Sequence, residues 1–268
     1  MRVNWLEHLL GEGWQVTPAG GATGEAYYAC RDENKLFIKR NSSPFLAVLS
    51  AEGIVPKLLW TRRLENGDVI SAQRWISGRE LKSSEMKGQR VTQLLQKIHR
   101  SKELLEMFKR IGNKPLTPQL IVDEITKRVS EFEYEAETIH KALFYLKEQI
   151  DQVNHHEFVV CHCDINHNNW VLSGEDELFL IDWDGAMVAD PALDLGLLLY
   201  WYIPINDWRD WLGKYGVKLD DDLGKRMHWY VVSQTIYAIF WHQGRHEISQ
   251  LNYWKSYLAE LLKGEVVE

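Results

Sequence analysis

The sequence predicts an α+β protein with two lobes, a small β-rich N-terminal lobe over residues 1–75 and a large helical C-terminal lobe over residues 76–268. Short runs of strand-forming residues, separated by polar turns, fill the first part. Helical hydrophobic periodicity dominates the second part, most clearly along residues 91–98. We find no internal repeat and no low-complexity tract that would suggest another organisation.

The N-terminal strands are predicted from local patterns. Two runs flank a polar turn at residues 31–34, as in a hairpin, and Asn66-Gly67 is the strongest short signal for a second hairpin. Ser43-Pro44 predicts the start of a short helix that reaches about Glu52, since proline is favoured in the first turn. The expected strands are residues 14–17, 26–30, 35–39, 57–60 and 69–75.

The C-terminal part is expected to be helical with a few brief strands. Residues 118–150 carry apolar side chains on one helical face, and everything after about Ala192 has helical character. Three short apolar runs interrupt the helices, and each has a length typical of a strand. These predicted strands are residues 158–161, 170–172 and 178–181.

Composition excludes several classes of protein. The chain has 31 Lys and Arg against 38 Asp and Glu, a formal charge of −7, and no local basic patch, which argues against direct nucleic-acid binding. Its longest nearly apolar run, residues 195–205, is far shorter than the roughly 20 residues of a membrane span. The first twenty residues lack an apolar signal core, and the three cysteines have no disulfide-framework spacing. We therefore expect a cytoplasmic protein with reduced thiols.

The most informative segment is His162-Cys163-Asp164, followed by Asn169 and then by Asp182, 18 residues after the first aspartate. Phosphoryl transfer needs a carboxylate that accepts or orients the proton of an attacking hydroxyl. It also needs hard oxygen ligands for Mg²⁺, for which an amide and a second carboxylate are suited. The spacing matches that of kinase catalytic loops. It predicts Asp164 as the base and Asn169 with Asp182 as metal ligands.

The N-terminal part supplies groups for a nucleotide. A glycine-rich turn at residues 20–24 would let backbone amides approach phosphates. Lys39 ends a strand and is placed to reach the α- and β-phosphates, and residues 73–75 end the last strand where a hinge would meet adenine. ATP with Mg²⁺ is therefore the expected cofactor. The expected nucleotide-binding residues are Gly21, Ala22, Thr23, Lys39, Arg74 and Trp75.

These segments resemble the aminoglycoside phosphotransferase/choline kinase family, whose pattern is His-Gly-Asp-x4-Asn, Ile-Asp-aromatic-acid and Asp-Pro-x-x-Asp-Leu. The corresponding residues here are 162–169, 181–184 and 190–195, and the likeness covers nearly the whole chain. The resemblance implies a protein-kinase-like fold that phosphorylates small molecules. It also implies that Asp194 braces the catalytic loop, and His162 is expected to make structural hydrogen bonds there.

Within that family, residues 43–46, 72–75 and 164–170 resemble bacterial cell-cycle regulators. The resemblance implies ATP-dependent phosphorylation of ribose, 2-deoxyribose or a ribose-containing metabolite. It further implies a role in the timing of replication initiation and contact with cell-division proteins. A choline- or aminoglycoside-type kinase and a kinase-fold scaffold remain the alternatives.

Two positions depart from the family pattern. Cys163 stands where the family has glycine, and the only acidic residue in the predicted helix after Ser43 is Glu52, near its end. A kinase lysine pairs with a helix glutamate, so the partner of Lys39 is left open, and Asp184 is assigned either to metal binding or to a turn.

The substrate pocket is expected among the 12 tryptophans. Most are predicted to pack in the core. Trp183, Trp201 and Trp241 are the candidates for stacking on a sugar, and an aromatic box for a quaternary ammonium group is the alternative. Zinc at Cys161, His162, Cys163 and His167 is the weaker reading of that segment, because the Cys-x-x-Cys spacing is missing.

Overall fold

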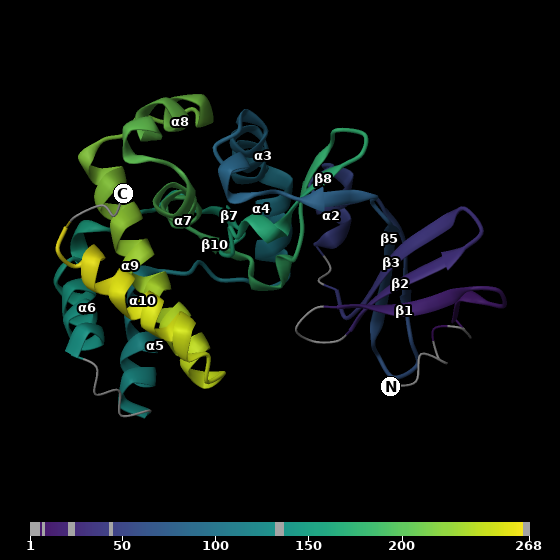
Figure 1. The fold of residues 1–268 in the computed structure, drawn as a ribbon, viewed down its shortest axis with the longest axis horizontal. Helices are drawn as coiled ribbons and strands as arrows, with labels where there is room; N and C mark the ends of the chain where they lie inside the picture. The colour runs from purple at the N-terminus through teal and green to yellow at the C-terminus, as the bar shows by residue number, and fades with distance from the viewer. Residues whose placement is uncertain (1–5, 7–8, 21–24, 43–44, 132–136, 265–268) are drawn as a thin grey trace. The chain divides into compact units, whose positions relative to one another are not determined.

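The computed structural model describes residues 6, 9–20, 25–42, 45–131 and 137–264. The chain divides into two compact units (Figure 1). The first comprises Met1–Leu81 and Asn168–Asp184, and the second comprises Lys82–His167 and Gly185–Glu268. This division differs from a single boundary near residue 75, because the segment that follows the predicted catalytic loop returns to the first unit.

A five-stranded antiparallel sheet in the order β1-β2-β3-β5-β4 forms most of the first unit. Leu36 and Ile38 alternate along β3, Ile70 and Ala72 alternate along β5, and together with Ala29 of β2 they form a common apolar cluster. This alternation is what the period of two in the sequence predicts. The strands are β1 (Gln15–Gly20), β2 (Ala26–Arg31), β3 (Asn34–Arg40), β4 (Leu58–Arg63) and β5 (Val69–Arg74).

Both predicted hairpins are confirmed. β2 pairs with β3 from Ala26↔Lys39 to Arg31↔Asn34, and Asp32 takes a left-handed conformation in the turn. β4 pairs with β5 around the Asn66-Gly67 turn, where Gly67 also has a positive φ of 91°. The short helix α2 (Leu46–Ala51) follows the sheet, whereas its predicted start at Ser43-Pro44 lies outside the described residues.

A second, three-stranded sheet completes the first unit. β6 (Gly78–Glu80) pairs with β8 (Trp170–Ser173), and β8 pairs with β9 (Leu178–Leu180). A Cβ at Gly78 would lie 2.4 Å from the carbonyl oxygen of Leu172, so β6 can approach β8 only with glycine there. The predicted strands at 170–172 and 178–181 are confirmed, while the three-residue β6 gave no signal in the sequence.

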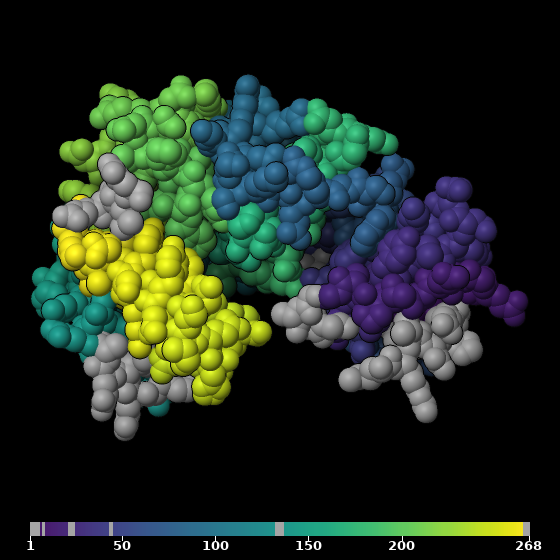
Figure 2. All heavy atoms as spheres, viewed as in Figure 1, coloured from purple at the N-terminus to yellow at the C-terminus, as the bar shows by residue number. Residues whose placement is uncertain are grey.

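The second unit is mainly helical. Its two-stranded sheet pairs β7 (Val159–Cys161) with β10 (Met187–Ala189). α9 packs against both α7 and α10, and α10, in yellow in Figure 2, forms an outer layer of this unit. The helices are α3 (Gln89–Arg100), α4 (Lys102–Arg110), α5 (Pro118–Glu131), α6 (Glu137–Glu148), α7 (Ala192–Tyr202), α8 (Trp208–Tyr215), α9 (Asp221–Gly244) and α10 (Ile248–Leu261).

The helical predictions are confirmed where the structure describes the chain. Residues 118–150 contain α5 and α6, and the region after Ala192 contains α7 to α10. Asp220 caps α9 by accepting the N–H of Leu223 at 2.9 Å, as expected for an acidic residue at a helix start. None of the described helices combines the length and apolarity that crossing a membrane would require.

Candidate active site

The predicted catalytic loop begins where β7 ends. β7 is buried and pairs with β10, and the chain then leaves the sheet through His162 and Cys163 to the exposed Asp164. Cys163 has a φ of +65°, a left-handed conformation in which glycine is favoured. The family pattern has glycine at this position. Cysteine in its place therefore strains the backbone.

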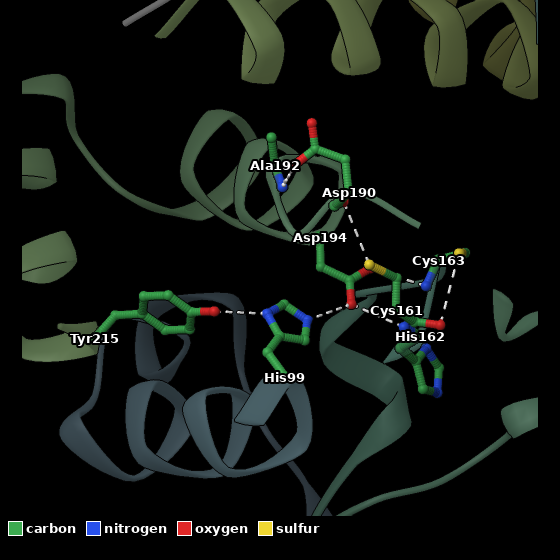
Figure 3. Close-up of polar contacts among 8 residues, drawn as sticks. All are labelled: His99, Cys161, His162, Cys163, Asp190, Ala192, Asp194 and Tyr215. Carbon is green, nitrogen blue, oxygen red and sulfur yellow. Dashed lines mark hydrogen bonds and ion pairs between the residues drawn. The ribbon is translucent and has the colours of Figure 1, made fainter. Parts of the chain in front are cut away.

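Asp194 holds this strained segment. Its Oδ2 accepts the backbone N–H of His162 at 2.7 Å, and its Oδ1 accepts that of Cys163 at 2.9 Å (Figure 3). Asp194 lies in the first turn of α7 and is fully buried. A buried carboxylate that accepts backbone N–H groups is a strong, geometrically fixed anchor. The carboxylate of Asp194 thus fixes the backbone of both His162 and Cys163.

Asp190 fixes the helix that carries Asp194. Its Oδ1 accepts the N–H of Ala192 at 2.8 Å and lies 2.5 Å from Nη1 of Arg226. Arg226 belongs to α9, so a buried ion pair joins the start of α7 to α9. An aspartate whose carboxylate accepts a backbone N–H is typical of a helix start.

The thiols beside the loop are packed rather than reactive. Burial, followed by the charge of the Asp194 carboxylate, raises the pKa of Cys161 and of Cys163 well above the ordinary value. Both sulfurs make weak hydrogen bonds to carbonyl oxygens, Cys161 to Asp190 at 3.4 Å and Cys163 to Cys161 at 3.7 Å. A thiol with a raised pKa is a poor nucleophile and a poor metal ligand.

Zinc therefore gains no support. The group of potential ligands that the described residues bring together is His99, Cys161 and Asp194, which differs from the set considered in the sequence. Its atoms are already engaged, because both nitrogens of His99 and both oxygens of Asp194 make hydrogen bonds within the protein. We assign this group to a hydrogen-bond network.

Asn169 and Asp182 belong to the first unit, where the β8–β9 hairpin connects them. Asn169 immediately precedes β8, and its carbonyl oxygen accepts the N–H of Ile181 at 2.8 Å. This backbone hydrogen bond joins the start of β8 to the end of β9, directly beside the predicted ligands Asn169 and Asp182. Asp182 is exposed and has a φ of +63°. An amide oxygen and a carboxylate oxygen are the donors that suit Mg²⁺, so these two residues fit that ion.

Lys39 has an acidic partner that the sequence did not identify. Its Nζ lies 2.7 Å from Oδ2 of Asp184 and 3.6 Å from Oδ1 of Asp182. The family pattern places such a partner in the helix after β3, where Glu52 was the only acidic residue and the partner was left open. The Asp182-Trp183-Asp184 segment itself was the available signal, because two carboxylates two residues apart attract a nearby lysine.

The predicted nucleotide-binding residues have different outcomes. Gly21, Ala22 and Thr23 lie outside the described residues. The N–H of Arg74 donates to the carbonyl oxygen of Lys57 at 2.8 Å, and that of Trp75 donates to Lys35 at 3.1 Å. These two N–H groups are used within the sheet, so a backbone donor for adenine would come from beyond Trp75.

The three candidate tryptophans have unlike surroundings. Trp183 is 6% exposed, and its Nε1–H donates to the carbonyl oxygen of Leu180 at 2.7 Å, which makes it a core residue of the first unit. In the second unit, Trp201 packs on Trp254 with ring centroids 5.6 Å apart. Trp241 is 57% exposed and lies under the guanidinium group of Arg245. Burial leaves Trp183 no free ring face for a sugar, whereas Trp201 and Trp241 remain candidates.

The fold and these residues define a class of protein, the kinase-like phosphotransferases. Residues 18–229, most of the chain, match the phosphotransferase enzyme family, and the chain belongs to that family.

Similar solved structures confirm the kinase-like fold. The choline kinase LicA from Streptococcus pneumoniae has a TM-score of 0.73 and 18% identity, with 98% of each chain covered. A choline/ethanolamine kinase family protein from Mesorhizobium loti has a TM-score of 0.68 and 15% identity over 92% of this chain and 88% of that one. Spectinomycin phosphotransferase has a TM-score of 0.70 and 16% identity, with 98% of each chain covered.

Proposed function

We propose that this phosphotransferase is an ATP-dependent kinase that transfers the γ-phosphoryl group to a hydroxyl of ribose, 2-deoxyribose or a ribose-containing metabolite. One observation carries the kinase reading with Asp164 at its centre. The backbone before the exposed Asp164 is held in a strained conformation by the buried carboxylate of Asp194. Strain that the surrounding structure maintains is typical of functional loops.

In this proposal Asp164 accepts or orients the proton of the attacking hydroxyl, which makes the oxygen a better nucleophile. Lys39 binds the phosphates of the nucleotide, with Gly21, Ala22 and Thr23 of the glycine-rich turn, and adenine lies near Trp75. Asn169 and Asp182 would hold Mg²⁺, which when bound neutralises charge on the phosphates. Asp184 keeps the ammonium group of Lys39 beside the loop that carries Asp182.

Comparisons support ATP as the nucleotide. LicA has been solved with AMP, and spectinomycin phosphotransferase with ADP and spectinomycin. Aminoglycoside 2'-phosphotransferase-IIIa has been solved with GDP, so GTP is the nucleotide to compare with ATP.

The sugar substrate rests on the resemblance of residues 43–46, 72–75 and 164–170 to the bacterial cell-cycle regulator CcrZ. The same resemblance supports a role in the timing of replication initiation and contact with cell-division proteins. The second candidate is a choline-type kinase. The likeness to LicA and the packed aromatic rings of Trp201 and Trp254 favour it, because aromatic faces bind quaternary ammonium groups.

The test is phosphorylation by the purified protein. We would incubate it with Mg²⁺ and ATP or GTP, adding in turn ribose, 2-deoxyribose, adenosine, choline and spectinomycin, and identify the phosphoester by mass. We expect a phosphorylated ribose-type product, with Asp164→Asn lowering kcat about 10²- to 10⁴-fold. The matched control is Asp151→Asn, another exposed aspartate of the second unit, which should retain wild-type kcat.

Phosphocholine as the main product would replace the sugar assignment with the choline alternative. Near-normal turnover by Asp164→Asn would refute its role as base.

A further inference from the structure

Two side chains stand behind Asp194 and are not used by the chemistry proposed above. His99, from α3, places Nε2 3.0 Å from Oδ2 of Asp194, and Tyr215, the last residue of α8, places its hydroxyl 2.7 Å from Nδ1 of His99. Figure 3 shows the three side chains in a row that ends at the catalytic-loop backbone. Tyr215 is 6% exposed, His99 7% and Asp194 fully buried, so solvent does not compete for these bonds.

The direction of the hydrogen bonds follows from the groups. An ionised carboxylate can only accept hydrogen bonds, so Nε2 of His99 carries a proton and donates the hydrogen bond to Asp194. Burial raises the pKa of Tyr215 far above its ordinary value, and the charge of the Asp194 carboxylate adds to the effect, so the phenol stays protonated and its O–H donates a hydrogen bond to Nδ1. Asp194, held in place by His99, accepts the backbone N–H groups of His162 and Cys163 and so fixes the conformation of the loop.

α8 packs against α3 near Tyr215, the residue of the row most distant from the loop. The side-chain amide of Gln96 donates a short hydrogen bond to the carbonyl oxygen of Tyr215. The next residue, Gly216, has a φ of +98°, and a Cβ there would lie 2.6 Å from Nη2 of Arg100 and 3.0 Å from Nε2 of Gln96. Both atoms are the far ends of flexible side chains of α3, so it is the positive φ of Gly216 that favours glycine at the end of α8, next to these two side chains.

The hydrogen bonds alone could be explained as a way to pair buried polar groups, with no role in catalysis. That explanation would not account for where the row ends, which is the one carboxylate that holds Cys163 in a left-handed conformation next to Asp164. Without His99, Oδ2 of Asp194 keeps only the N–H of His162, which belongs to the loop itself. The carboxylate is then less firmly oriented, and the loop's strained backbone is less well held.

We propose that Tyr215 and His99 are positioning residues for phosphoryl transfer, which act through Asp194 on the backbone before Asp164. This proposal rests on the proposed function. It makes the seating of α8 on α3 a determinant of turnover, although neither helix contributes a group to the chemistry.

The chain offers a matched control. Tyr145 and His228 form a second, half-buried pair, with the tyrosine hydroxyl 2.8 Å from Nδ1 of the histidine, but His228 Nε2 donates to the carbonyl oxygen of Leu261 and not to a loop anchor. Tyr215→Phe and Tyr145→Phe each remove one hydroxyl that is hydrogen-bonded to a histidine Nδ1, and each keeps the ring. They should cost similar stability, yet only Tyr215→Phe should affect the loop.

We would measure kcat and KM with Mg²⁺, ATP and ribose, and amide hydrogen exchange of a peptide covering residues 159–166 without ligand. For Tyr215→Phe we expect kcat to fall between about 5-fold and 100-fold with KM for ATP little changed, and faster exchange in that peptide. Tyr145→Phe should change neither quantity. His99→Gln, which retains a donor for Asp194, should keep more of kcat than His99→Leu.

Unchanged exchange in Tyr215→Phe, or equal acceleration in both tyrosine variants, would overturn the proposal. The exchange measurement does not depend on the substrate. An inactive wild-type protein with faster loop exchange only in Tyr215→Phe would therefore count against the proposed function and support the positioning row.

Discussion

The ammonium group of Lys39 lies 2.7 Å from the carboxylate of Asp184, although 145 residues separate them in the chain. The pair joins β3 to the loop that carries Asp182, so one lysine contacts both carboxylates of the Asp-Trp-Asp segment. The sequence pattern suggested a helix glutamate as the partner. In the first unit, the charge that orients Lys39 comes instead from beside the proposed metal ligand.

This relationship predicts that Asp184→Asn affects ATP more than stability. Asp184 is 55% exposed and Lys39 21%, and pairs with such exposure contribute less than about 1 kcal/mol to the free energy of unfolding. Losing the partner leaves Lys39 less well placed for phosphates, so KM for ATP should rise by up to about tenfold. Glu137→Gln removes another 2.7 Å pair, with Lys141, and is the control that should leave KM unchanged. An unchanged KM in Asp184→Asn would show that Lys39 needs no partner.

Asp182→Asn tests the metal assignment. Asparagine tolerates the left-handed backbone at this position, so the substitution removes the charge with little strain. We expect the Mg²⁺ concentration for half-maximal activity to rise at least about tenfold, since even outer partners of metal ligands have effects of this size. Nucleotide binding measured without Mg²⁺ should change much less. Identical Mg²⁺ titrations for the variant and the wild type would exclude Asp182 as a ligand.

Local features of the fold could be predicted from the sequence. The β2–β3 hairpin has alternating strands and a polar turn within 15 residues, and Asn66-Gly67 marks the next hairpin. Asp190 and Asp220 each stand just before a helix, and each accepts the N–H of a residue two or three positions later, so such contacts are also local. In each case the interaction and its signal lie in the same short segment.

Contacts between residues that are far apart in the chain could not be predicted from local sequence patterns. The return of residues 168–184 to the first unit depends on a three-residue strand, β6, which is too short for a periodic pattern. Tyr215 and His99 are 116 residues apart and looked like ordinary helix residues. Trp183 was expected at a substrate because of its place in the motif, but its burial follows from packing against Phe45.

Cys163 offers a test of stored backbone strain. Cys163→Gly and Cys163→Ala both delete the thiol, but only glycine relieves the positive φ, which costs a side-chain-bearing residue about 1–2 kcal/mol. After the larger entropy of glycine in the unfolded chain is subtracted, we expect Cys163→Gly to be about 1 kcal/mol more stable than Cys163→Ala by urea unfolding. At Cys161, in the regular strand β7, the order should reverse, because glycine weakens a strand. The same order at both positions would show that the strain is not significant.

Gly196 sets the approach of α7 to α9. A Cβ at this position would lie 2.9 Å from the carbonyl oxygen of Met227 and 3.1 Å from Cγ2 of Val231. Gly196→Ala should therefore lower the free energy of unfolding by about 1–3 kcal/mol through overpacking. Gly224→Ala, also in a helix but with open space around the new methyl group, should raise it by about 0.5–1 kcal/mol. Equal effects at the two glycines would contradict close packing between α7 and α9.

His228 predicts a loss of stability in mild acid. Nε2–H of His228 donates to the carbonyl oxygen of Leu261, so Nδ1 must accept the Tyr145 hydroxyl, and only the neutral ring fits both bonds. Burial lowers the pKa of His228 below its ordinary 6.5. Between 6.5 and the lowered value the unfolded chain binds a proton that the folded chain does not, so stability falls as the pH falls through this window.

Urea unfolding at about pH 8 and about pH 5.5 measures this effect, because the loss of stability begins near the ordinary pKa of histidine, which lies between these two values. The wild type should lose more of its free energy of unfolding across this interval than His228→Gln, whose side chain cannot titrate. The comparison uses the difference between the two pH values within each protein, so a constant cost of the substitution at both values cancels. Equal losses in the two proteins would mean that His228 does not remain neutral in the fold, and that the Tyr145 hydroxyl is not held by an accepting Nδ1.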